Sequence, residues 1–238
     1  MPDLPRPALV VALPGTGSDA DFARRAFGPA CAALDLPFLA VEPDPRAVVD
    51  SCRAALDTAA RSGPVLAAGI SLGAAIAVEW ARARTDSAFG VIAALPAWTG
   101  SDTAECPAAI SAATTAAQLR ADGLDAVVER MTGSSPAWLG AALSQSWAAQ
   151  WPHLPDALDE AATYSWPAPE TLAALHVPAT IVTAVDDPVH PLPVAEQWAA
   201  LIPRAELHRI TLAELGADPA ILGCRGLSRL AGRQATHR

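Results

Sequence analysis

The sequence contains no lysine, few histidines and fewer basic than acidic residues, and these features limit the functions that the protein can have. All 16 basic residues among the 238 are arginine, so mechanisms that need a lysine Schiff base or a lysine general base are excluded. The formal net charge of −9 argues against a protein that binds nucleic acid by neutralising phosphates. Histidine, the usual proton carrier in nucleophilic catalysis, occurs only five times.

Paired cysteines and long apolar runs are also missing. The four cysteines are scattered at Cys31, Cys52, Cys106 and Cys224 with no Cys-x-x-Cys pair, so we expect buried free thiols and no metal site. Residues 1–7 lack the charged-then-apolar pattern of a signal peptide. No apolar run reaches the roughly 18 residues that span a bilayer. We therefore expect a cytoplasmic protein without a metal or cofactor.

Short apolar runs alternate with longer helical patterns through most of the chain. With 52% hydrophobic and 17% charged residues, the chain can bury the core of one ordinary domain. Alternation of this kind is typical of a parallel α/β sheet. The expected strands are residues 8–13, 37–41, 65–70, 89–95, 179–185 and 206–212.

The alternation of strand and helix patterns stops in the middle of the sequence. Residues 99–174 contain no convincing strand and break into short helical patterns at Gly and Pro. Four of the seven tryptophans lie there. We expect one domain over residues 1–238, with about six mostly parallel strands, helices on both faces, and residues 99–174 as an inserted helical cap.

The segment Gly69–Gly73 matches the pattern G-x-S-x-G and lies between an expected strand and an expected helix. The chemistry of a nucleophilic serine needs this placement, because a tight strand-to-helix turn holds the hydroxyl of Ser71 out of the sheet. Glycines at both ends let the strand and the helix approach closely. At the helix N-terminus, backbone N–H groups favour developing negative charge. The alternative is an ordinary glycine-rich turn.

The loop Leu13–Asp19 (LPGTGSD) joins the first strand to the first helix. A Walker-type phosphate loop is excluded because the loop has no lysine, and a dinucleotide loop would need a third glycine. We interpret it as an oxyanion-hole loop, in which the N–H of Thr16 joins that of Leu72 to stabilise a tetrahedral oxyanion.

These features together resemble the α/β-hydrolase superfamily. The resemblance spans nearly the whole chain and rests on LPGTGSD, GISLG, the helical cap and the late segment VTAVDDPVHP (residues 182–191). In hydrolases of this kind the triad acid follows the corresponding strand, which implies Asp187. Its neighbour Asp186 and, after the fourth strand, Asp102 remain alternatives. Any of the three could instead cap a helix or a turn.

The resemblance also implies a histidine in the loop after the last strand, and this sequence has none there. Residues 213–219 contain no histidine. His190 lies a few residues beyond the acid at the carboxyl edge of the sheet, so we take it as the base for Ser71. The remaining candidates are weaker: His153, His176, His208 and His237, or the carboxylates Glu214 and Asp218 acting as base directly.

Tryptophans of the cap and of the fourth strand offer an apolar surface. Trp98, Trp138 and Trp147 would line a pocket for an acyl chain or aromatic group if they face Ser71, or would simply pack the cap onto the core. We expect a serine hydrolase, a carboxylesterase or thioesterase acting on a small apolar ester. The alternatives are a ligand-binding or scaffold protein that has lost hydrolysis, and a lyase or acyltransferase using the same pocket.

Overall fold

The computed structural model describes residues 6–228 and 230–231, and its centre is one parallel sheet. Six strands pair in the order β2-β1-β3-β4-β5-β6, and every neighbouring pair is parallel. This confirms the expected sheet. The strands are β1 (Leu9–Leu13), β2 (Phe38–Ala40), β3 (Val65–Ile70), β4 (Ala88–Ala94), β5 (Ala179–Ala184) and β6 (Ala205–Ile210).

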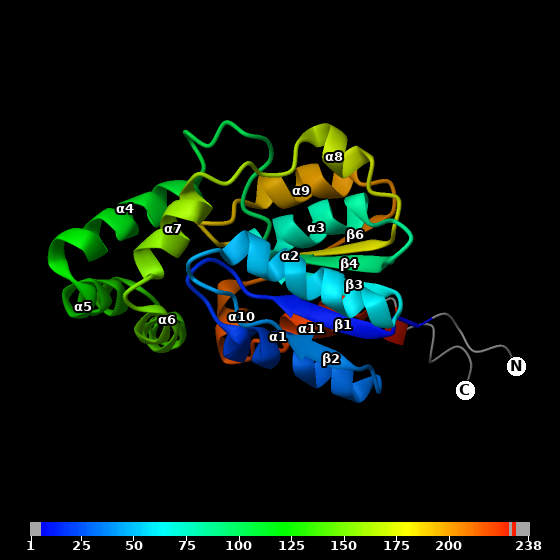
Figure 1. The fold of residues 1–238 in the computed structure, drawn as a ribbon, viewed down its shortest axis with the longest axis horizontal. Coiled ribbons are helices and arrows are strands. Elements are labelled where there is room, and N and C mark those ends of the chain that lie inside the picture. Colours follow the sequence, from blue (N-terminus) through cyan, green and yellow to red (C-terminus); the bar gives the residue numbers. More distant parts are fainter. Residues whose placement is uncertain (1–5, 229, 232–238) are drawn as a thin grey trace, which may run out of the picture.

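Helices cover both faces of the sheet, because both faces are apolar. In β1, Val11 and Leu13 belong to one buried cluster while Val10 and Ala12 belong to the other, as the twofold alternation of a strand requires. The first face carries α2 (Val48–Ala59), η1 (Ala60–Ser62), α3 (Leu72–Ala83) and α9 (Leu192–Leu201); the second carries α1 (Ala20–Ala33), α10 (Leu212–Ala217) and α11 (Ile221–Gly226) (Figure 1).

Five helices connect β4 to β5, within the segment where a cap was expected. They are α4 (Pro107–Asp122), α5 (Leu124–Ser134), α6 (Ala137–Gln150), α7 (Leu154–Ala162) and α8 (Pro169–Ala173). Helices α4 to α7 gather beyond the end of the sheet where the strands finish (Figure 1). The short α8 lies with α3 and α9 over the sheet. A cap helix can therefore reach loops at the carboxyl edge.

The largest local difference from expectation follows β6. We expected a loop at residues 213–219, but the chain forms α10 there. A capping box explains it: the Thr211 hydroxyl accepts from the Glu214 N–H, and the Glu214 carboxylate accepts from the Thr211 N–H. These bonds satisfy N–H groups at the start of a helix that is only six residues long.

Two further expectations concern cysteine and membranes. Three cysteines are buried as free thiols, whereas Cys224 is exposed, so the expectation of burial was wrong for that residue. Its position on the solvent side of α11 was not evident from the sequence pattern. Across residues 6–228 and 230–231, no helix combines the length and the apolar character needed to span a membrane.

Candidate active site

Ser71 occupies a strained turn between β3 and α3. Its backbone has φ 54° and ψ −114°, and a positive φ is costly for a residue with a side chain. A Cβ added to Gly69 would lie 2.1 Å from the carbonyl oxygen of Gly73, and one added to Gly73 would lie 2.5 Å from that of Pro14. The two glycines are therefore required by close backbone contacts, as the G-x-S-x-G pattern indicated.

A chain of hydrogen bonds connects Ser71 to His190 and Asp187. The Nε2 atom of His190 lies 3.0 Å from the Ser71 hydroxyl oxygen, and its Nδ1 lies 2.7 Å from a carboxylate oxygen of Asp187. With the imidazole proton on Nδ1, His190 donates to Asp187 and accepts from Ser71. The geometry is that of a nucleophile, a base and an orienting acid.

Asp187 is held in its charged form by its surroundings. Burial alone would raise its pKa, but the hydrogen bond and charge of His190 and the backbone N–H groups of Val189 and His190 lower the pKa below its usual value. One carboxylate oxygen accepts both N–H groups, at 2.8 and 3.3 Å, while the other faces the imidazole. The ionised Asp187 thereby fixes the orientation of the ring.

The other two acid candidates bind elsewhere. Asp186 accepts a 2.7 Å hydrogen bond from the Leu212 N–H at the start of α10. Asp102 is exposed, and its carboxylate accepts from the Ala104 N–H two residues along its own turn. Both make the capping or turn contacts that the sequence left open as alternatives.

The remaining histidines and carboxylates have other contacts. His208 lies in β6, and its Nε2 atom is hydrogen-bonded to the Ser228 hydroxyl. His153 lies beside Asp156 in the cap, and His176 is exposed. His237 lies outside the described residues. Glu214 caps α10, and Asp218 accepts from the Ala220 N–H.

The loop between β1 and α1 lies directly against Ser71. A Cβ added to Gly15 would be 3.4 Å from the Cβ of Ser71 and 3.4 Å from the carbonyl oxygen of Ile70. Thr16 follows in this loop, and Leu72 supplies the first N–H of α3. The two segments that should supply oxyanion donors thus meet at the serine, and the donor roles of Thr16 and Leu72 stay predictions.

The three tryptophans predicted to line a substrate pocket make packing contacts. Trp98 donates its indole N–H to the Asp102 carbonyl oxygen. Trp138 stacks on Phe22 of α1, and its indole fills the space beside Gly216 of α10. Trp147 is buried with its ring against Gly17, in the loop next to Ser71. The contacts of Trp138 and Trp147 fix α6 onto the sheet domain, and a role of the three tryptophans in substrate binding stays a prediction.

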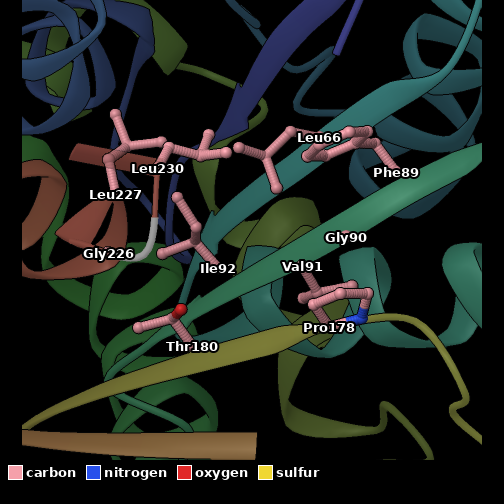
Figure 2. A pocket seen from close by; sticks show the side chains of 10 residues that line it. All are labelled: Leu66, Phe89, Gly90, Val91, Ile92, Pro178, Thr180, Gly226, Leu227 and Leu230. Atoms are coloured by element: carbon pink, nitrogen blue, oxygen red, sulfur yellow. The ribbon is translucent and has the colours of Figure 1, made fainter. Parts of the chain in front are cut away.

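The apolar crevice in Figure 2 is far from this chemistry along the strands. Its lining includes Leu66 near the start of β3, Phe89 near the start of β4, and Pro178 just before β5. Ser71 follows the carboxyl end of β3. Because the crevice lies at the amino ends of parallel strands, it is not the space in front of the serine.

The described part of the chain contains no comparable group of side chains for metal or thiol chemistry. Residues 6–228 and 230–231 contain no cluster of three or more metal-ligating side chains. Burial raises the pKa of the Cys31 and Cys52 thiols to about 12, so neither forms a thiolate readily at neutral pH. Ser71, His190 and Asp187 therefore form the candidate catalytic group.

Comparison with known proteins gives similarities at the level of structure. No model of a protein family and no curated protein matches the sequence. A carboxylesterase structure from the thaumarchaeon Nitrososphaera gargenis matches with a TM-score of 0.70 and 14% identity, covering 97% of this chain and 91% of that one. A thermophilic esterase from Thermogutta terrifontis gives 0.66 and 17%, with 96% and 88% covered. MenH from S. aureus gives 0.67 and 16%, with 99% and 94% covered.

Proposed function

We propose that this protein, which has the α/β-hydrolase fold, is a serine hydrolase that cleaves a small apolar ester or thioester. The observation that carries the proposal is the 3.0 Å contact between His190 Nε2 and the Ser71 hydroxyl, with Asp187 behind the imidazole at 2.7 Å. A serine hydroxyl is a weak nucleophile alone and becomes effective when a neighbouring base removes its proton.

In the first half of the reaction, Ser71 Oγ attacks the carbonyl carbon of the substrate. His190 Nε2 takes the hydroxyl proton as the C–O bond forms, and Asp187 stabilises the imidazolium without accepting its proton. The tetrahedral intermediate then collapses and the bond to the leaving alcohol or thiol breaks. His190 returns the proton to that leaving group, and the acyl group remains esterified to Ser71.

The second half repeats these steps with water as the nucleophile. His190 takes a proton from water, the hydroxyl attacks the acyl carbon, and the proton returns to Ser71 as the carboxylic acid departs. In both halves negative charge develops on the former carbonyl oxygen. The N–H groups of Leu72 and Thr16 would bind that oxygen, assisted by the N-terminus of α3.

Support for an ester substrate comes from the structural neighbours and from the enclosure of the site. Two of the similar structures are an esterase and a carboxylesterase. Ser71 is only 7% exposed, so its hydroxyl is largely shielded from bulk water. A protein that only binds ligand would not need an imidazole against the hydroxyl. A lyase or acyltransferase would be distinguished by its products.

Hydrolysis of p-nitrophenyl esters from acetate to octanoate, and of a matching acyl thioester, tests the proposal. We expect turnover by the wild-type chain, and loss of it in Ser71→Ala. Ser101→Ala is the matched control because Ser101 is an exposed serine near the start of the inserted segment. Equal turnover by Ser71→Ala and Ser101→Ala would overturn the proposal, as would a folded wild-type chain that cleaves none of these substrates.

A further inference from the structure

Helix α6 buries polar side chains on the face that meets the sheet domain. Ser146 is 1% exposed and Gln150 is 5% exposed, and the buried Trp147 lies between them. Residues at positions i, i+1 and i+4 of a helix project from one side of it. A polar side chain is buried at little cost only when it is hydrogen-bonded, so the partners of these residues show what this face is for.

The nearest partners of Ser146 and Gln150 lie in the loop that follows β1. The Ser146 hydroxyl donates to the Gly17 carbonyl oxygen at 2.7 Å, and the Gln150 side-chain N–H donates to the Ser18 carbonyl oxygen at 3.0 Å. Between these bonds, Trp147 Nε1 lies 2.8 Å from where a Cβ on Gly17 would stand. Two consecutive peptide units of the loop are thus fixed by one helix of the cap.

The same loop is fixed at its other end by the serine turn. Gly15 packs against Ser71, and the Ser18 N–H donates to the Gly15 carbonyl oxygen at 3.1 Å. Thr16 is therefore enclosed by a turn whose two ends touch different parts of the molecule. A shift of α6 would move the Gly17 and Ser18 peptides and, through the turn, the N–H of Thr16.

We propose that Ser146 and Gln150 are positioning residues that set the orientation of the Thr16 N–H, so that the oxyanion hole is complete only when α6 is docked on the loop. The inference rests on the proposed function, because an oxyanion arises only if Ser71 attacks a carbonyl. It adds a dependence of catalysis on a helix that supplies neither the nucleophile, the base nor the acid. Catalytic donors act only when they are held in place before the reaction.

The test uses Ser146→Ala, Gln150→Met and the double variant in the full chain. Each removes a donor while leaving most of the side-chain volume in place. Ser144→Ala is the matched control, because Ser144 lies on the same helix and its hydroxyl donates to the Gly140 carbonyl oxygen of that helix. Circular dichroism and the thermal midpoint identify any variant that fails to fold.

Kinetics with an ester that the wild-type chain cleaves provide the first readout. We expect the double variant to lose about tenfold or more in kcat with a smaller change in KM, because the lost interaction forms in the transition state. The inhibition constant of an alkyl boronic acid, which forms a tetrahedral anionic adduct with the serine, should rise by the same factor as kcat/KM falls. A purely structural helix would not link these two quantities.

Amide hydrogen exchange of the peptide covering residues 14–19 provides the second readout and needs no activity. Exchange should be faster in the double variant than in the wild-type chain and unchanged in Ser144→Ala. If the wild-type chain cleaves nothing, the proposed function fails, while unchanged exchange in the double variant would overturn the coupling of α6 to the loop. Normal turnover in the double variant would overturn the positioning role and leave the hydrolase proposal standing.

Discussion

Two segments at the carboxyl edge of the sheet differ in what they contribute to the site. The dyad loop (residues 185–191) follows β5, and the α10 segment (residues 211–218) follows β6. The dyad loop brings both Asp187 and His190 to Ser71. The α10 segment holds no histidine and uses its polar groups to cap a short helix.

An imidazole thus approaches Ser71 from the loop after β5 and not from the segment after β6. The two segments follow neighbouring parallel strands, so side chains of either segment can approach the carboxyl edge of the sheet. Two residues, Pro188 and Val189, separate Asp187 and His190 in the dyad loop, and Pro191 follows His190. The fixed φ of proline limits the conformations of such a loop, so the pair approaches the serine as one unit.

Removing the imidazole should have the largest effect. His190→Ala should lower kcat by about 10⁴-fold or more, because the serine loses its base and the leaving group loses its acid. His208→Ala, in β6 before the α10 segment, should stay within about twofold of wild type because no catalytic step needs it. Steady-state kinetics measure kcat for both variants. Equal losses of kcat would contradict the prediction that the base lies in the dyad loop.

Neutralising the acid should cost less than removing the base. Asp187→Asn should lower kcat by about 10²- to 10⁴-fold. The amide does not hold the imidazole in the required tautomer, and it carries no negative charge to stabilise the imidazolium. Asp218→Asn is the matched control in the α10 segment, because the carboxamide keeps an oxygen for the Ala220 N–H. Wild-type kcat in Asp187→Asn would refute the role of Asp187.

Removing the contact between the dyad loop and the α10 segment should have an intermediate effect on kcat. Asp186→Ala removes the acceptor for the Leu212 N–H and should destabilise the protein by about 1 kcal/mol, with a loss of about tenfold or less in kcat. Asp186→Asn retains an acceptor oxygen and should recover most of both quantities. Urea unfolding and kinetics measured together test this, and a loss in Asp186→Ala as large as that in Asp187→Asn would make Asp186 the rival acid again.

The capping box of the α10 segment should matter least for catalysis. Thr211→Ala removes a helix N-cap and should lower the free energy of unfolding by about 1 kcal/mol while changing kcat by less than about twofold. Thr211→Ser keeps the hydroxyl and should restore stability. A large kcat loss in Thr211→Ala at full stability would show that this segment takes part in the chemistry.

Residues with local chemical requirements were predictable from the sequence. The pattern around Ser71 is set by steric limits on a tight turn, and the order of strands and helices follows from apolar periodicity. His190 can be predicted as the base because it stands close to an acid that follows a strand. Its contact with Ser71 depends on the paths of two segments 119 residues apart, and no local pattern encodes that distance.

Contacts made by the cap were much less accessible to sequence reasoning. Ser146 and Gln150 are ordinary polar residues in an alanine-rich helix, and nothing in the pattern distinguishes them from solvent-facing ones. The helix α10 was missed because its apolar pattern is too short to stand out, although Thr211 and Glu214 have the spacing of a capping box. That spacing was the available signal.

Labelling by a fluorophosphonate measures whether Ser71 is an activated nucleophile, because the probe reacts with activated serines and needs no knowledge of the substrate. Peptide mass spectrometry locates the adduct, and intact mass gives its rate of formation. We expect an adduct on Ser71 in the wild-type chain, formed at least about 100-fold more slowly in His190→Ala. A folded wild-type chain without an adduct on Ser71, or equal rates in the two proteins, would contradict this prediction.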